Sequence, residues 1–161
     1  MREIGCILLL EDNEADQYII KRLLKKAGYN AELIISDEIS DYKSKLKKHS
    51  PDIILADFNV PGFDSFDALH ISRKINAFTP FIFVTGSISS EMAKDTVISA
   101  ADAFVLKDNL QALPTVLKSI WRYSSNYQKM QNEYLKLNDL NSKYDNLINK
   151  LKPLIYPVGH H

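Results

Sequence analysis

Residues 51–57 read PDIILAD, four apolar residues in a row that end on an aspartate. The run lacks the alternation of apolar and polar side chains that is typical of a strand with one solvent-exposed face. It is typical instead of a strand buried on both faces of a parallel sheet. Four similar runs recur along the chain, at residues 4–10, 31–35, 81–84 and 103–106.

Segments of helical length separate these runs. In the first, Ala15, Ile19, Leu23 and Ala27 follow each other at i, i+4 spacing, and Gly28 provides a stop signal. Further helices are predicted at residues 39–48, 65–75 and 91–100. Strand and helix therefore alternate, which predicts an α/β fold with a doubly wound, five-stranded parallel sheet and right-handed crossovers.

The composition is that of a globular protein and excludes few functions by itself. The 161 residues are 45% hydrophobic and 25% charged, and 20 basic residues balance 20 acidic ones. This balance gives no support for a nucleic-acid-binding surface, so we expect no nucleic-acid partner for this chain. No apolar stretch is long enough to span a bilayer, and a single cysteine, Cys6, allows no internal disulfide. We therefore expect a cytoplasmic protein without a membrane partner.

The residues that directly follow the apolar runs have carboxylate, hydroxyl and amine side chains, which are the candidates for a functional site. Glu11 and Asp12 follow the first run, Asp57 the third, Thr85 the fourth and Lys107 the fifth. The carboxyl ends of parallel strands meet at one edge of the sheet, so these side chains are expected to converge. Clustered carboxylates need a cation between them, and oxygen ligands of this number suit Mg²⁺.

A carboxylate beside Mg²⁺ can attack phosphorus and form an aspartyl phosphate. The ammonium and the hydroxyl would stabilise the charge of the phosphoryl group. Each residue alone has a simpler interpretation: Glu11 and Asp12 could cap a helix, Thr85 could belong to a turn, and Lys107 could be a surface lysine. Their conjunction at four strand ends favours the chemical interpretation.

Five motifs, at residues 8–12, 51–57, 60–62, 83–86 and 101–107, resemble those of response-regulator receiver domains, the CheY-like family. The resemblance covers residues 4–121 and implies the flavodoxin-like sheet arrangement of that family. It implies a receiver in a two-component phosphorelay, phosphorylated by a histidine kinase or phosphotransfer protein. Such a domain is not an enzyme beyond its own Mg²⁺-dependent phosphorylation and dephosphorylation.

The resemblance also implies a role for each residue. Asp57 matches the phosphoacceptor, and Glu11, Asp12, Asp57 and the backbone carbonyl of Asn59 match the Mg²⁺ ligands. The remaining matches are the switch residues Thr85 and Phe104 and the salt-bridging Lys107. The alternative is a pseudo-receiver that works without phosphorylation, as a module for protein interaction or dimerisation.

A long helix is predicted after the receiver, because Pro114 suits a first helical turn and a heptad pattern follows it. One series is Leu113, Ile120, Tyr127, Tyr134, Asn141 and Ile148; the other is Val116, Tyr123, Met130, Leu137, Tyr144 and Leu151. This pattern favours a parallel coiled coil between two copies, or a signalling helix that leads into a further domain, over a helix that folds back on its own domain. The residues predicted for a dimer helix are Tyr127, Met130, Tyr134, Leu137, Asn141, Tyr144, Ile148 and Leu151.

The predicted organisation is a receiver at residues 1–122, a helical extension at 123–152 and a tail at 153–161. Pro153 and Pro157 are expected to mark the end of the helix. We interpret the final Gly-His-His, residues 159–161, as a remnant of an affinity tag.

Overall fold

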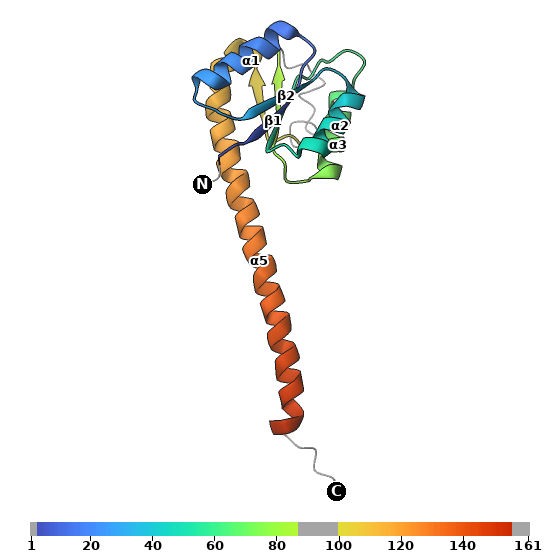
Figure 1. The fold of residues 1–161 in the computed structure, drawn as a ribbon, viewed down its shortest axis with the longest axis vertical. Helices are drawn as coiled ribbons and strands as arrows, with labels where there is room; N and C mark the ends of the chain where they lie inside the picture. The colour runs from blue at the N-terminus through green and yellow to red at the C-terminus, as the bar shows by residue number, and fades with distance from the viewer. Residues whose placement is uncertain (1–2, 87–99, 156–161) are drawn as a thin grey trace. The chain divides into compact units, whose positions relative to one another are not determined.

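The computed structural model describes residues 3–86 and 100–155, which form a five-stranded parallel sheet with helices on both faces (Figure 1). The strands are β1 (Cys6–Leu10), β2 (Glu32–Ser36), β3 (Ile53–Ala56), β4 (Phe81–Thr85) and β5 (Ala103–Leu106). Their order in the sheet is β2-β1-β3-β4-β5, and all neighbours are parallel. The predicted doubly wound fold with its long C-terminal helix is confirmed.

The described helices are α1 (Glu14–Lys26), α2 (Ile39–His49), α3 (Ser65–Ile75), the 3-10 helix η1 (Lys107–Ala112) and α5 (Leu113–Ile155). The helix predicted at residues 91–100 falls almost entirely outside the described residues. The chain divides into two compact units, residues 1–125 and 126–161, and the sheet belongs to the first. Among the described residues, none of the helices has the length and apolar character that crossing a membrane requires.

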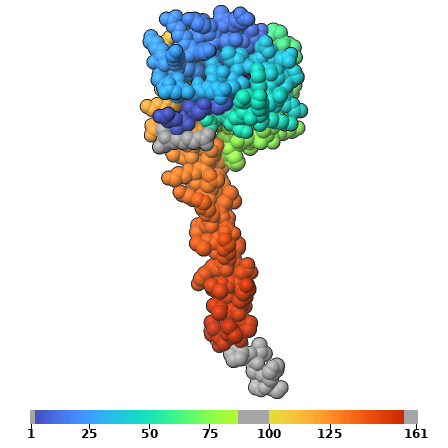
Figure 2. All heavy atoms as spheres, in the orientation of Figure 1, coloured from blue at the N-terminus to red at the C-terminus, as the bar shows by residue number. Residues whose placement is uncertain are grey.

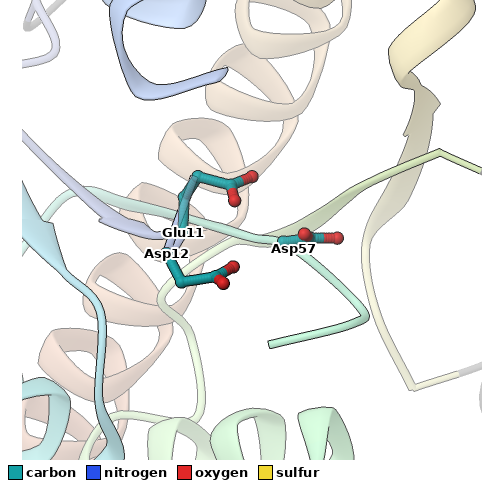
Figure 3. Close-up of side chains that lie close together, drawn as sticks. All are labelled: Glu11, Asp12 and Asp57. Atoms are coloured by element: carbon teal, nitrogen blue, oxygen red, sulfur yellow. The ribbon is translucent and has the colours of Figure 1, made fainter. Parts of the chain in front are cut away.

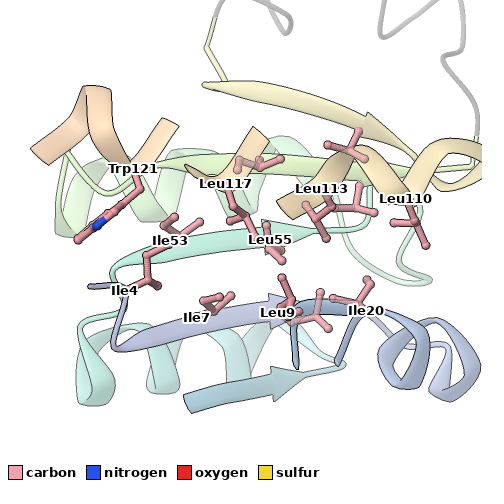
Figure 4. Close-up of a cluster of buried hydrophobic side chains, with 14 residues drawn as sticks. Ile4, Ile7, Leu9, Ile20, Ile53, Leu55, Leu110, Leu113, Leu117 and Trp121 are labelled. Atoms are coloured by element: carbon pink, nitrogen blue, oxygen red, sulfur yellow. The ribbon is translucent and has the colours of Figure 1, made fainter. Parts of the chain in front are cut away.

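One face of the sheet is covered by α1 and by the first turns of α5 (Figure 4). Alternate strand residues such as Ile7, Leu9 and Leu55 point to this side and are at most 1% exposed. Leu113 and Leu117 of α5 are fully buried against them. The first turns of α5 therefore belong to the core of the receiver unit.

The opposite face is covered by α2 and α3. The intervening strand residues, Leu8, Leu10, Ile54 and Ala56 among them, pack there against Tyr42 of α2. The Tyr42 hydroxyl donates to the Ala68 carbonyl of α3 at 3.0 Å. Because the strands are covered on both faces, their sequences show no polar alternation, as the apolar runs predicted.

The carboxyl ends of the strands are aligned by hydrogen bonds that continue past the strands themselves. The amide of Glu11 donates to the carbonyl of Ser36 at 2.9 Å, and the amide of Asp57 donates to the carbonyl of Leu10 at 2.8 Å. These bonds hold the residue after β1 beside β2, and the residue after β3 beside β1. The polar residues that follow the strands are therefore fixed by the register of the sheet.

Two turns next to α1 explain how it starts and stops. The side chain of Asn13 accepts hydrogen bonds from the amides of Ala15 and Asp16, at 2.9 and 3.1 Å, and so caps the first turn. At the other end, Gly28 has φ of +86°, a left-handed conformation that glycine adopts without steric cost. The helix therefore begins at Glu14, with only the capping Asn13 between it and the acidic pair that follows β1.

The long helix departs from the sequence prediction at its N-terminal end. It begins at Leu113, one residue before Pro114, and η1 stands where a short turn was predicted. At the other end it continues past Pro153 to Ile155, the last residue that the structure describes. A proline has no backbone N–H to donate to the preceding turn, and its ring crowds that turn. In the last turn of the described helix, this missing hydrogen bond affects only a few residues.

The first members of the heptad series, which precede the residues predicted for a dimer helix, lie in the receiver unit, and Leu113 is buried in its core. Val116 and Ile120 are partly buried against the same core. These residues are not available to a second chain. A surface for self-association can begin only further along the helix.

We expect Leu117→Ala to lower the free energy of unfolding by about 2–5 kcal/mol, because a fully buried leucine leaves a cavity when it is truncated. Leu135→Ala, on the same helix at a position 62% exposed, should change it by less than about 0.5 kcal/mol. Urea denaturation followed by circular dichroism measures both. Equal effects would contradict the assignment of the first turns of α5 to the core.

Candidate functional site

Three carboxylates meet at the carboxyl edge of the sheet (Figure 3). Glu11 and Asp12 directly follow β1, and Asp57 directly follows β3. One oxygen from each lies within 4.8 Å of the others. Glu11 is fully buried, Asp57 is buried and Asp12 is exposed, so the cluster opens to solvent on the side of Asp12. The three acids predicted from the strand ends therefore lie together.

Lys107, the first residue after β5, reaches into this cluster. Its Nζ lies 2.8 Å from Oε2 of Glu11 and 3.0 Å from Oδ2 of Asp57. A third carboxylate, Asp16 Oδ2 on α1, lies 2.6 Å from the same nitrogen. Burial disfavours the charged ammonium, but its contacts with the carboxylates of Asp16, Glu11 and Asp57 outweigh this effect and raise the pKa of Lys107 well above its ordinary value. The three carboxylates therefore favour the positively charged form of Lys107.

Glu11 is held from several directions. Its Oε1 accepts from the amide of Asn13 at 2.9 Å, and its carbonyl accepts from Nε2 of Gln17 at 2.7 Å. Burial raises the pKa of the Glu11 carboxyl, and the charge of Asp57 adds to this, although Lys107 and the Asn13 amide act against it. The ionised form of Glu11 is therefore disfavoured mainly by its burial, and a further cation beside it would offset that cost.

One carboxylate oxygen of Glu11 indicates which kind of ligand the site could bind. Glu11 Oε2 is buried and forms an ion pair with Lys107, and none of the described groups donates a hydrogen bond to this oxygen. A buried carboxylate oxygen with unused acceptor capacity is suited to a cation. Glu11, Asp12 and Asp57 therefore fit a hard divalent metal ion such as Mg²⁺, with open positions for water.

Asp57 is oriented by the loop that follows it. The amide of Asn59 donates to Oδ1 of Asp57 at 3.2 Å, while Lys107 binds Oδ2. Ser65, the first residue of α3, donates to the carbonyl of Phe58 and contacts that of Asp57 at 3.5 Å. Both carboxylate oxygens of Asp57 are thereby held in place. The carbonyl of Asn59 remains a predicted metal ligand.

The two predicted switch residues lie on neighbouring strands. Thr85 ends β4, is fully buried and pairs in the sheet with Leu106, the residue before Lys107. Phe104 of β5 stacks on Phe83 of β4 with ring centroids 5.4 Å apart. Phe83 in turn contacts Phe58 edge to face, at a centroid distance of 5.4 Å. Because Phe58 directly follows Asp57, three aromatic rings connect the acidic site to the predicted switch residue.

Asp16 is the site residue that the sequence reasoning missed. It lies in the first turn of α1, one turn after Asn13, and its carboxylate makes the shortest of the three Lys107 contacts. The available signal was its position: an acid in the helical turn that starts beside the acidic pair. Phe58 and Phe83 were likewise not singled out, since they read as ordinary core residues.

The residues predicted for a dimer helix lie in the second unit, where α5 is the only described element (Figure 2). Tyr127, Met130, Tyr134, Leu137, Tyr144 and Leu151 are between 37% and 62% exposed. Asn141 is exposed and Ile148 half-buried. The prediction overlooked Leu140, Leu147 and Leu154, which are spaced by seven residues and at least 54% exposed. The apolar stripe is therefore wider than the predicted seam.

Comparison with known proteins identifies the class. The family model of the response regulator receiver domain matches residues 7–118, so the chain belongs to the response regulator receiver domain family. The family resemblance inferred from the five motifs is thereby confirmed, and the protein is a receiver domain of the two-component type.

Two of the matched relatives are longer than this chain. The chain is 27% identical over 135 residues to the transcriptional regulatory protein TrcR of Mycobacterium tuberculosis, a match that covers 83% of this chain and 52% of TrcR. It is 30% identical over 125 residues to the 3′,5′-cyclic-nucleotide phosphodiesterase regA of Dictyostelium discoideum, covering 72% of this chain and 16% of regA. The chain thus spans about half or less of the curated relatives it matches.

A solved structure has the same fold. The CheY-like receiver domain protein from Methanospirillum hungatei JF-1 superimposes with a TM-score of 0.67 at 22% identity, over 78% of this chain and 99% of that one. At this level of identity the likeness supports the fold alone.

We predict that Glu11→Gln stabilises the metal-free protein at neutral pH. The folded pKa of Glu11 is raised, so its ionisation removes stability as the pH rises from below its ordinary value of 4.5 through the folded pKa. The advantage of the variant should therefore grow as the pH rises from 4 to 7. Chemical denaturation at several pH values in the presence of a chelator measures it.

Mg²⁺ should reverse this order. At one hundred times its Kd a ligand stabilises the folded state by about 2.7 kcal/mol, and the variant should lose most of that gain. Glu14→Gln, at an exposed acid in the first turn of α1, is the control and should respond to Mg²⁺ like the parent. A variant that is less stable than the parent without metal at every pH would contradict our account of Glu11.

Proposed function

We propose that this receiver domain accepts a phosphoryl group on Asp57, donated by the phosphohistidine of a histidine kinase or phosphotransfer protein. The observation that supports the proposal most is the double contact of Lys107 with Glu11 and Asp57, beside the three converging carboxylates. A structural ion pair needs one carboxylate. Three carboxylates around one open space, with an ammonium at their side, suit the binding of a metal and a phosphoryl group.

The reaction transfers the phosphoryl group from a histidine nitrogen to a carboxylate oxygen of Asp57. The P–N bond breaks, its electron pair returns to the imidazole nitrogen, and an aspartyl phosphate forms. When bound by Glu11, Asp12 and Asp57, Mg²⁺ would supply charge that offsets the repulsion between the carboxylates and the phosphoryl oxygens. Lys107, already 3.0 Å from Asp57, is placed to exchange its contact with Oδ2 for one with a phosphoryl oxygen.

The proposed response involves Thr85 and Phe104. The Thr85 hydroxyl would donate to the phosphoryl group, and Phe104 would follow because the two residues occupy adjacent strands. Phe104 stacks on Phe83, which also contacts Phe58. These packed rings would link a movement of Phe104 to the loop beside Asp57. The only catalytic activity that we propose is the Mg²⁺-dependent phosphorylation and dephosphorylation of the domain itself. We also propose that the protein is cytoplasmic.

The phosphoryl transfer is tested by the intact mass of the protein after incubation with Mg²⁺ and acetyl phosphate. The parent should gain one phosphoryl mass, and Asp57→Ala should gain none because it lacks the acceptor oxygen. Asp67→Asn, which removes an exposed carboxylate from α3, is the matched control and should behave like the parent.

A parent that gains no mass, with acetyl phosphate or with a phosphohistidine donor, would exclude the phosphotransfer function. The interaction module that works without phosphorylation would then be the better description. Omitting Mg²⁺ or adding a chelator should abolish the gain in the parent.

We further propose that two copies associate through the second unit, by a parallel coiled coil along α5. The support is a stripe of exposed apolar side chains at heptad spacing, which continues for the whole described length of this unit. Leu140, Leu147 and Leu154 widen the stripe beyond the two predicted series. A helix with this much exposed apolar surface is better explained by burial against a second copy than by solvent.

Leu137→Asp should shift the protein to monomers, because it places a charge in the proposed seam. Leu135→Asp is the matched control: it makes the same change on the same helix, two residues away and outside the stripe, at similar exposure (62% against 54%). Sedimentation equilibrium of the parent and both variants measures the oligomeric state. A monomeric parent, or dissociation by both variants alike, would contradict the proposed interface.

A further inference from the structure

Asp16 occupies a place that neither the metal cluster nor the proposed acceptor chemistry explains. Its Oδ2 lies 2.6 Å from Lys107 Nζ and accepts a hydrogen bond from it. The contact joins residues 91 positions apart in the chain, and the two side chains are only 26% and 18% exposed. Asp16 is not one of the three acids whose oxygens converge as possible metal ligands.

The first turn of α1 holds Asp16 in this position. Asn13 caps the turn and accepts a hydrogen bond from the Asp16 amide at 3.1 Å, and the amide of Asn13 is itself bound to Glu11. The backbone of Asp16 is thereby tied, through Asn13, to the residue that follows β1. A carboxylate on so constrained a turn has little freedom to leave Lys107.

Lys107 contacts carboxylates of two kinds, those of the possible metal site and one outside it. Glu11 and Asp57 belong to the possible metal site, whereas Asp16 lies outside it. If Asp16 were neutral, the ammonium would be left to Glu11 and Asp57 alone. It would then compete with a divalent cation for the oxygens that the cation needs.

We infer that Asp16 is a positioning residue, whose carboxylate anchors the Lys107 ammonium on the α1 side of the site and keeps Glu11 and Asp57 available to Mg²⁺. This inference rests on the metal-dependent part of the proposed function. A simpler interpretation is an acid that merely suits the positive end of a helix. That interpretation applies equally to Glu14, which stands in the same turn, and it does not account for the 2.6 Å contact with Lys107.

The test is the affinity for Mg²⁺, measured by calorimetric titration at fixed ionic strength. Asp16→Asn should weaken Mg²⁺ binding about tenfold or more, as is common when a residue that orients the ligands is lost. Glu14→Gln removes the same charge from the same turn without touching Lys107, and should weaken it by less than about threefold because salt screens its distant charge. Asp16→Glu, which keeps the carboxylate, should recover most of the affinity.

A double-mutant cycle separates positioning from charge. In a Lys107→Gln background the effect of Asp16→Asn should shrink to that of Glu14→Gln, because no ammonium remains to be anchored. Equal effects of Asp16→Asn and Glu14→Gln in the parent, or an undiminished effect of Asp16→Asn in the Lys107→Gln background, would overturn the inference.

The outcomes also distinguish this inference from the proposed function. A parent that binds no Mg²⁺ overturns both the inference and the metal dependence of the phosphotransfer. If the parent binds Mg²⁺ with the predicted dependence on Asp16 but is never phosphorylated, the inference stands and the phosphotransfer fails. If the parent is phosphorylated and Asp16→Asn binds Mg²⁺ like the parent, only the inference fails.

Discussion

The ammonium of Lys107 and the carboxylates around it form the interaction on which the carboxyl edge of this domain depends. Three elements bring acids to one place, since Glu11 follows β1, Asp57 follows β3 and Asp16 lies on α1. Without a positive charge among them, burial of Glu11 and Asp57 would be costly, because the interior screens like charges less than water does. Lys107 joins these elements to β5, 50 residues after Asp57 and 91 after Asp16. The ion pairs of the site therefore also connect parts of the chain that are distant in sequence.

The sheet makes this arrangement possible by fixing where each strand ends. Its two faces are buried by different helices, α1 and α5 on one side and α2 and α3 on the other. A shift of one residue in any strand would turn its side chains to the wrong face, so the register is strongly determined. The position of the residue after each strand is then determined as well. Precise placement of the functional groups follows from packing far from them.

The sequence predicted what depends on periodicity and on strand ends. Glu11, Asp12, Asp57, Thr85 and Lys107 could be expected at one edge because each directly follows an apolar run, and parallel strands align their carboxyl ends. Asp16 could not be expected there, because its contact depends on how α1 turns back over the sheet. The path from Phe58 through Phe83 to Phe104 was hidden for a related reason: residues of a core look alike in sequence, and only their packing shows which rings touch.

The long helix shows a further limit of pattern reading. A heptad repeat identifies an apolar stripe but does not say what covers it, and Leu113, which fits the repeat, is buried in its own domain. Further along the helix Leu140, Leu147 and Leu154 form a row beside the predicted seam, which a strict two-position reading of the repeat excluded. The same spacing of apolar residues therefore serves the core of the receiver unit at the start of the helix and an exposed stripe further along it.

The charge state of Lys107 also affects the reactivity of the domain toward acyl donors. An amine attacks an activated acyl group only in its unprotonated form, and the surrounding carboxylates keep this amine protonated by raising its pKa. Lys143 on α5, by comparison, is 72% exposed and contacts a single carboxylate, that of Asp139, at 2.7 Å. The carboxylates that organise the site therefore also slow acylation of Lys107, the lysine whose charge the site requires.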